Sequence, residues 1–152
     1  MSVDLGNIKG LYLSATLQTG GNRFLTSNFT EALLLQNVTL TIGRDVIDAS
    51  TFDDLMNRAF KAGRKTVTLS FSGLWDHDGD TGQVIARTAA LADTQATALI
   101  AGLVTSDVSG DDEYYFEGIP NSFVITDPDN AVSTVSGNIT INTASLAFQA
   151  VT

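Results

Sequence analysis

The clearest pattern of alternating apolar and polar residues lies in the middle of the chain, between Arg64 and Leu74. From Thr66 onward every second side chain is apolar, which is the period of a strand with one buried face. The apolar positions are Val67, Leu69 and Phe71, and the polar positions between them are Thr66, Thr68, Ser70 and Ser72. The pattern therefore predicts a half-buried strand.

An acidic turn follows this strand, and the period then changes to that of a helix. Asp80 stands where it can cap a helix, and Gln83 can reach back to it as in a capping box. The residues that then share one side of a helix are Val84, Ile85, Thr88, Ala89, Leu91 and Ala92. We expect an amphipathic helix from Asp80 to Ala92 that lies against β structure.

Strand-like patterns flank this unit on both sides. They are the segments 11–17, 35–46, 97–105, 114–118, 123–126 and 131–143. Within the second of them, Gly43-Arg44-Asp45 indicates a bulge or a turn. The third is almost continuously apolar, which favours a strand buried on both faces. The last one alternates, with Val135, Gly137, Ile139 and Ile141 on one face.

Two segments have weaker patterns. Residues 50–63 begin with Ser50 or Thr51 as an N-cap and end at Gly63, which predicts a short helix. The alternative is a packed excursion with a single helical turn. Residues 1–34 lose their period after Gly20-Gly21 and form an arm, a long loop or an extra strand.

The number and spacing of these elements predict the fold class. The strands are many and short, the turns are closely spaced, and the helices are at most two. This combination is typical of a mainly β, sandwich-like or barrel-like domain with one flanking α-helix, to which residues 50–63 would add a second short helix. A length of 152 residues is most simply one domain, 1–152.

Composition narrows the classes of function. The net charge is −9, from 17 acidic and 8 basic residues, and the largest basic group is Arg64-Lys65 with Lys61. So small a basic group argues against a protein that grips nucleic acid, whereas an acidic surface that nucleic acid slides past, or plain solubility, fits the charge. Cysteine is absent, so disulfides and thiolate metal sites are excluded. No apolar run approaches the roughly 20 residues of a membrane helix, and we expect no membrane partner.

The residue types that carry catalysis or metal binding do not combine into a site. Asp76, Asp78 and Asp80 alternate like calcium ligands, but the glycine and glutamate of a calcium loop do not follow at their positions. His77 is the sole histidine, so zinc would lack a second imidazole, and serine-based catalysis would depend on this one base. We therefore expect no enzyme activity, no metal and no cofactor.

Three consecutive aromatic residues, Tyr114, Tyr115 and Phe116, form a candidate subunit interface. On a strand, Tyr114 and Phe116 would share one face and Tyr115 would take the other. Either both faces are covered within the domain, or one face meets another subunit.

Four segments, taken in order, resemble the tail tube proteins (major tail proteins) of long-tailed bacteriophages. They are Val46-Ile-Asp-Ala-Ser-Thr51, the strand segment from Phe60 to Gly73, the acidic turn and alanine-rich helix from Asp78 to Ala92, and Tyr114 to Thr126 with the turn and strand that lead to Ile141. The order and spacing of these motifs carry the resemblance. It covers Leu35 to Phe148 and leaves residues 1–34 outside.

The resemblance implies the phage tail tube fold and a structural role in the virion tail. Copies would close into rings, usually hexameric, and the rings would stack into a tube for the ejection of double-stranded DNA. The implied partners are further copies, the tape measure protein and the tail terminator protein. Residues 43–63 would form an inter-ring or lumen loop, and the acidic turn 76–80 is a further candidate for the lumen. The candidate residues of the loop are Asp45, Asp48, Asp53, Asp54, Arg58 and Lys61.

Physical chemistry supports this expectation without requiring it. Sheet edges are a liability unless they are paired, and sheets joined around a ring would pair them. Acidic residues in a lumen would repel phosphates and let DNA slide. The alternative from another class is a monomeric or trimeric β-sandwich binding module, such as a capsid decoration or carbohydrate-binding domain.

Overall fold

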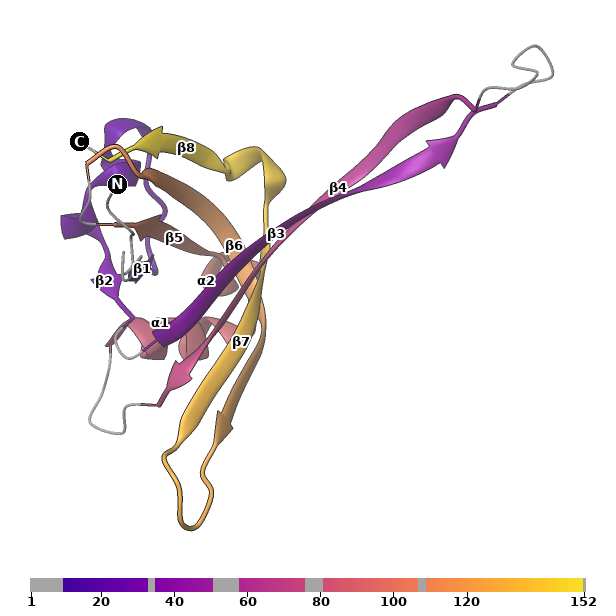
Figure 1. The fold of residues 1–152 in the computed structure, drawn as a ribbon. Coiled ribbons are helices and arrows are strands. Elements are labelled where there is room, and N and C mark those ends of the chain that lie inside the picture. Colours follow the sequence, from indigo (N-terminus) through magenta and orange to yellow (C-terminus); the bar gives the residue numbers. More distant parts are fainter. Residues whose placement is uncertain (1–9, 33–34, 51–57, 76–80, 107–108, 152) are drawn as a thin grey trace, which may run out of the picture.

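A computed structural model describes residues 10–32, 35–50, 58–75, 81–106 and 109–151. Within these residues, one antiparallel sheet of eight strands has the order β2-β1-β5-β6-β7-β4-β3, and β8 pairs with β6 (Figure 1). The mainly β prediction is confirmed, and the described strands form one sheet. The strands are β1 (Gly10–Ser14), β2 (Thr30–Glu31), β3 (Leu35–Asp48), β4 (Phe60–Leu74), β5 (Ile100–Thr105), β6 (Asp112–Thr126), β7 (Thr134–Ile141) and β8 (Ala147–Ala150).

Strand β6 connects two sections of this sheet. Its first half pairs with β5 on one side and with β8 on the other, whereas its second half, from Gly118 to Thr126, pairs with β7. We call β1, β2, β5, β8 and the first half of β6 the body section. The second half of β6 continues with β7, β4 and β3, and these strands are called the four-strand section.

The four-strand section confirms the alternation predicted from the sequence. Leu69 of β4 lies opposite Leu40 of β3 on one side and opposite Ile139 of β7 on the other. All three side chains point to one face of the sheet, because directly opposed residues in an antiparallel ladder share a face. The predicted irregularity at Gly43-Arg44-Asp45 is also confirmed, since the register of β3 and β4 shifts between Arg44 and Val46.

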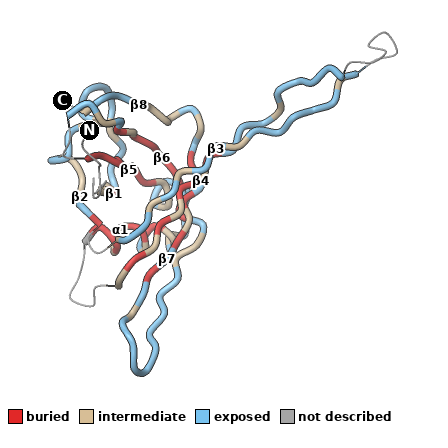
Figure 2. The backbone as a smooth tube through the Cα atoms, viewed as in Figure 1, coloured by how far each residue is buried: buried red, intermediate tan, exposed pale blue. Residues whose placement is uncertain are grey.

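Helix α1 (Thr81–Ala90) covers the face of the sheet that carries the buried side chains, on the side of the body section (Figure 1). Ala86 and Ala89 belong to the same buried cluster as Leu69 and Ile139. At the start of the helix, a Cβ atom on Gly82 would lie 2.4 Å from the carbonyl oxygen of Glu31. Small residues therefore let the helix approach the sheet closely. Buried residues concentrate in the body section and the middle of the long strands, and the two hairpin ends are exposed (Figure 2).

The buried side of α1 agrees with the predicted one at Ala89 and differs at other positions. Gln83, Ala86 and Ala89 are buried, whereas Leu91 is 75% exposed. The predicted capping partner Asp80 lies outside the described residues, and the side-chain amide of Gln83 donates to the carbonyl oxygen of Leu74 at 2.9 Å. Close packing against the sheet favours the small residues Ala86 and Ala89, and Leu91 lies just beyond the last residue of α1.

The predicted helix over residues 50–63 is wrong in its C-terminal part. Phe60 to Gly63 belong to β4, where Lys61 lies opposite Ile47 and Phe60 opposite Asp48; residues 51–57 lie outside the described part. The hydrogen-bonded ladder with β3 outweighs the local helical signals. Among the described residues the second α-helix is α2 (Gln95–Ala98), and the strand predicted from residue 97 begins at Ile100.

Two further boundaries differ from the prediction. The strands predicted at 114–118 and 123–126 form the single strand β6, which carries a register shift between Pro120 and Ser122. Within residues 1–34, β1 lies inside the sheet between β2 and β5, with Leu11 and Leu13 in the core. The same stretch also holds 3-10 turns at Gly20–Phe24 and Thr26–Asn28 and the short strand β2, and residues 1–9 and 33–34 lie outside the described part.

Candidate assembly surfaces

A long hairpin of β3 and β4 projects from the domain (Figure 1). It continues beyond the pair Ile42 and Val67, where the strands leave the buried cluster. We call residues 43–50 and 58–65 the projecting hairpin. Its apolar side chains are solvent-exposed: Val46 is 66% exposed, Phe60 58% and Ile47 54%. Exposed apolar side chains on a strand pair with no further cover are typical of a surface that contacts another molecule.

Hydrogen bonds hold the far end of the projecting hairpin together. The Asp48 carboxylate accepts from the Ser50 amide at 2.9 Å, and the Ser50 hydroxyl accepts from the Ala59 amide at 2.9 Å. Bonding to Ser50 lowers the pKa of Asp48 below its usual value. Of the predicted loop residues, Asp45, Asp48, Arg58 and Lys61 are exposed on this hairpin. Asp53 and Asp54 lie outside the described residues.

The outer face of the four-strand section is a second candidate surface. The register aligns its outward side chains in three rows across β3, β4, β7 and β6. The rows are Thr41, Thr68, Thr140 and Ile119; Thr39, Ser70, Asn138 and Ser122; and Asn37, Ser72, Ser136 and Val124. Ten of these positions carry a hydroxyl or an amide, two are aliphatic, and none is charged. We call this surface the hydroxyl-amide face.

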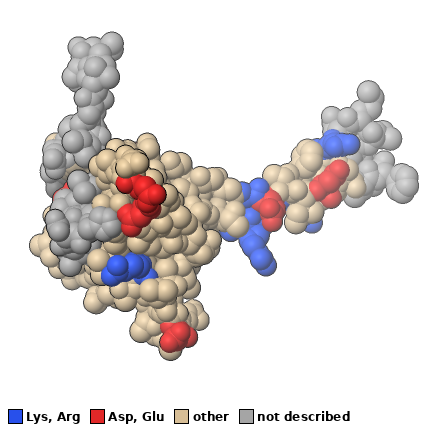
Figure 3. Space-filling view, turned by 90° about the horizontal axis from the view of Figure 1, so that it is seen from below, with Lys and Arg blue, Asp and Glu red and all other residues tan. Residues whose placement is uncertain are grey.

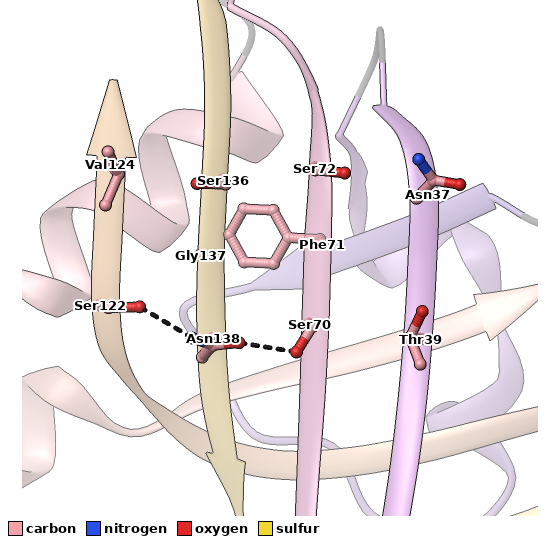
Figure 4. Close-up of a pocket in the computed structure, with 10 residues that line it drawn as sticks. All are labelled: Asn37, Thr39, Ser70, Phe71, Ser72, Ser122, Val124, Ser136, Gly137 and Asn138. Carbon is pink, nitrogen blue, oxygen red and sulfur yellow. Dashed lines mark hydrogen bonds between the residues drawn. The ribbon is translucent and has the colours of Figure 1, made fainter. Parts of the chain in front are cut away.

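Side-chain hydrogen bonds cross the strands of the hydroxyl-amide face (Figure 4). The Ser70 hydroxyl donates to the side-chain oxygen Oδ1 of Asn138 at 2.6 Å, and the side-chain nitrogen Nδ2 of Asn138 donates to the Ser122 hydroxyl at 3.2 Å. The middle of the face forms a shallow hollow of about 320 Å³. Behind it, the Phe71 ring packs against Gly137, where a Cβ atom would lie 2.6 Å from Cζ of the ring.

Both margins of the four-strand section lack a strand partner among the described residues. β3 ends the strand order and is hydrogen-bonded only to β4. On the opposite margin, β5 pairs with β6 only as far as Gly118, so residues 119–126 of β6 have a strand neighbour on one side alone. Unpaired strand edges favour pairing with another chain. Both margins of the four-strand section are therefore open to pairing with a strand of another chain.

Comparisons with solved structures show which fold the chain has. The tail of an empty gene transfer agent (GTA) particle is 15% identical over 87% of this chain and 99% of that chain, with a TM-score of 0.65. The SPP1 tail tube is 11% identical over 97% of this chain and 79% of that chain, with a TM-score of 0.71. This chain has the tail tube fold. The baseplate of the anti-feeding prophage shares the fold at 7% identity over 98% of this chain and 97% of that chain, with a TM-score of 0.61. No family model and no curated relative matches the sequence.

In this tail tube fold, the aromatic triplet is mostly internal. Tyr115 is 1% exposed and Phe116 is fully buried, whereas Tyr114 is half-buried beside Phe148. The domain itself therefore covers the side chains of Tyr115 and Phe116, and Tyr114 is the member of the triplet that stays partly open to another subunit. Both faces are covered because β6 lies between the core on one side and the segment before β2 on the other.

Tyr115 instead anchors the segment between β1 and β2. Its hydroxyl donates to the Glu117 carboxylate at 2.6 Å and accepts from the Gln18 amide at 3.1 Å. The Phe29 ring and the Arg23 guanidinium approach the Tyr115 ring. Burial, together with the bond to Glu117, raises the pKa of Tyr115 well above its usual value. This contact fixes the early part of the tail tube fold to β6.

Other candidate chemistry is weakly represented in the described part. The acidic turn 76–80, with His77, lies outside it. Within the described ranges, no three His, Asp or Glu side chains converge as metal ligands would. Neither helix among these residues has the length and apolarity to span a bilayer. The alternating Ser, Thr and Asn of β3, β4 and β7 were visible in the sequence, but only the strand register shows that they form one face.

Proposed function

We propose that this chain is a structural subunit of a virion tail tube, in which copies close into rings and the rings stack into a conduit for double-stranded DNA. The observation that carries the proposal is that both unpaired margins belong to the same four-strand section, in a chain with the tail tube fold. A head-to-tail contact that closes by rotation forms a ring. The solved GTA tail was refined with C6 symmetry, and we propose six copies for this protein as well.

Ring closure would join the free edge of β3 in one copy to the free second half of β6 in the next. Main-chain hydrogen bonds would then continue from one four-strand section into its neighbour, as in other cases of strand addition. This pairing would remove both exposed edges at once. The projecting hairpin lies beyond the paired length of β3 and stays free for a different contact.

We further propose that the hydroxyl-amide face lines the lumen. Helix α1 and the body section lie on the opposite face of the four-strand section, and a ring of several copies has more room for this bulk outside than inside. The DNA would then meet hydroxyl and amide groups without a formal charge. Such a wall neither attracts phosphates as lysines do nor repels them as acids do. This proposal replaces the expectation of an acid-lined tube wall by a neutral one.

Electron microscopy and thiol labelling test this proposal together. The chain has no cysteine, so Ser136→Cys on the hydroxyl-amide face and Thr88→Cys on the exposed side of α1 each provide a single thiol. In unassembled protein, both thiols should react with a small maleimide and with a maleimide carried on a large polymer. In assembled tubes, Ser136→Cys should lose reaction with the large reagent and keep that with the small one, while Thr88→Cys keeps both.

Two results would count against the proposal in different ways. If concentrated protein forms neither rings nor tubes in negative stain, the role as a tube subunit is refuted. If tubes form and Ser136→Cys still reacts with the large reagent, the tube role stands and the lumen assignment is refuted. The tape measure and tail terminator partners stay predictions from the resemblance, and co-purification of tubes with each protein would test them.

A further inference from the structure

A groove lies between the free margin of β6 and the C-terminal end of α1. It is a hollow of about 360 Å³, and the residues that line it include Arg87, Ala90, Leu91, Phe123 and Ile125. Ile125 lies opposite the buried Val135, so it points to the core side of the sheet, and Phe123, two residues earlier, shares that side. The groove therefore opens on the face of the four-strand section opposite to the hydroxyl-amide face.

Aromatic rings give this groove a fixed wall. The centroid of the Phe123 ring lies 6.2 Å from that of Phe71 and 6.0 Å from that of Trp75. On the side of the helix, the Arg87 guanidinium lies 5.6 Å from the centroid of the Trp75 ring. Because these groups hold one another within the isolated chain, the groove is formed before anything binds, which lowers the cost of binding.

Leu91 forms the exposed rim of the groove. Its side chain is 75% exposed, more than any other large apolar side chain in the part of the chain that the structure describes, and Ile125 is 38% exposed. Exposed apolar side chains beside a preformed hollow are typical of a binding surface. The sequence pattern placed Leu91 on the buried side of its helix, and the isolated domain leaves it uncovered.

The opposite margin of the same section carries a row of apolar side chains on the core side. The row lies opposite buried residues of β4 and consists of Leu35, Val38, Leu40 and Ile42. Ile42 is 59% exposed. Neither residues 35–42 of β3 nor residues 119–126 of β6 include a charged residue, and charged patches are also sparse on the face of the domain seen in Figure 3. Free strand edges are usually protected by charges, so these two margins lack a common defence against pairing.

Strand direction shows how β3 of a second copy would meet the groove. Neighbouring strands in the order β6-β7-β4-β3 are antiparallel, so β3 runs opposite to β6. Copies in a ring share one direction along its axis, and β3 of the next copy is then antiparallel to the free half of β6. Continuous pairing keeps side chains of one face together. The core-side row of β3 would therefore lie on the same side as the groove.

From this arrangement we infer that the groove between α1 and β6 receives a core-side apolar side chain of β3 from a second copy in the same ring. The inference rests on the proposed tube function and adds a side-chain contact to the main-chain pairing. Leu91 covers the incoming side chain from outside. The joint then has polar side chains on its hydroxyl-amide face and an apolar seal on the other face. Exclusion of water by this seal strengthens the hydrogen bonds between the two strands.

Substitutions at Leu91 test the seal by sedimentation. Leu91→Ser removes the apolar side chain, whereas Leu91→Met nearly conserves its volume. Because Leu91 is exposed in the isolated chain, both unassembled variants should unfold at the temperature of the original protein. Leu91→Ser should raise the protein concentration at which half of the chains form rings by about tenfold or more, as expected for the loss of one buried leucine. Leu91→Met should stay within about threefold.

A matched control separates the groove from other exposed apolar positions. Leu25 is 50% exposed and lies outside the groove lining. Leu25→Ser makes the same chemical change as Leu91→Ser and should form rings at the concentration of the original protein. An equal loss of assembly in both variants would mean that general surface hydrophobicity drives association, and the inference would be wrong.

Cross-linking identifies what fills the groove. The chain has no cysteine, so Leu91→Cys can be combined with one further cysteine at each position of the core-side row in turn. The second substitutions are Leu35→Cys, Val38→Cys, Leu40→Cys and Ile42→Cys. In assembled protein, a short bismaleimide should produce covalent dimers with at least one of these pairs, because side chains that face each other across neighbouring strands lie close together. Unassembled protein should produce none, and neither should Leu25→Cys in place of Leu91→Cys.

The outcomes distinguish this inference from the tube function. If the original protein forms neither rings nor tubes, the tube function itself fails. If rings form and Leu91→Ser assembles at the original concentration, the groove contact is refuted while the pairing of β3 with β6 stands. The inference is also refuted if Leu91→Ser weakens assembly but no cysteine of β3 links to Leu91→Cys, since another segment or molecule then occupies the groove.

Discussion

Gly137 lies in β7 behind the hydroxyl-amide face, at a position with no room for a single added atom. Ser136 and Asn138, its neighbours in β7, point outward into the proposed lumen wall, and Gly137 faces the core. A Cβ atom there would lie 2.6 Å from Cζ of Phe71 and 2.7 Å from the carbonyl oxygen of Ser122. The ring tip can shift only slightly because Phe71 is buried. The carbonyl belongs to the backbone of β6, so relief there requires the two strands to separate.

We therefore expect Gly137→Ala to lower the free energy of unfolding by about 3 kcal/mol, the upper end of the usual range for overpacking. For a domain of this size, that corresponds to a fall in Tm of roughly 6–12 °C. The measurement is urea unfolding together with a thermal scan. Gly21→Ala is the matched control, because its added Cβ would meet no atom within 4 Å; its stability should change by less than about 0.5 kcal/mol.

The second variant Phe71→Leu shows which of the two contacts dominates. Leucine has no Cζ, so the clash with the ring disappears while the clash with the Ser122 carbonyl remains. Gly137→Ala should accordingly cost less in the Phe71→Leu background than in the original chain, with a coupling of about 1 kcal/mol. The reasoning is refuted if Gly137→Ala is no more destabilising than Gly21→Ala, or if its cost is unchanged in the leucine background.

Three further predictions concern the described contacts. Tyr115→Phe should cost about 1–2 kcal/mol, since it removes the bond to the Glu117 carboxylate. Burial raises the pKa of Tyr115 in the folded state, so above about pH 10 only the unfolded state releases the proton and the original protein should lose stability. Urea unfolding at several pH values should show a shallower loss in Tyr115→Phe. Asn138→Ala removes both bonds of the hydroxyl-amide chain, and chemical denaturation should detect a loss of roughly 1–2 kcal/mol. Leu91→Ser should leave Tm nearly unchanged because Leu91 is exposed, and a clear fall would contradict the position of α1.

The strands of the four-strand section were the most predictable part of the fold. Their alternation is local: Val67, Leu69 and Phe71 each stand two residues apart, and the same period returns at Val135, Ile139 and Ile141. Sequence alone thus assigned the inward and outward side chains correctly. It did not show that β7 lies between β4 and β6, because strand order depends on long-range pairing that no local pattern records.

The candidate surfaces were predicted less well for the same reason. The helical signals around Ser50 and Gly63 are genuine, but pairing with β3 provides more hydrogen bonds than a short helix can. Ala89 was correctly predicted to be buried, but hydrophobicity wrongly added Leu91, whereas the closeness of the sheet favoured Gln83 and Ala86. The sequence left open whether the domain or another subunit covers the aromatic triplet, because it does not show that the segment before β2 folds over Tyr115.

The two unpaired margins of the four-strand section have a consequence for the protein before it assembles. If these margins join in the proposed ring, a freshly synthesised copy carries both halves of the joint, and the described part of the sheet leaves both halves open. Mutual repulsion between copies of net charge −9 opposes such encounters at long range. Growth in the cell would then depend on a nucleus that holds the first copies together, and the timing of assembly would be controlled by when that nucleus forms.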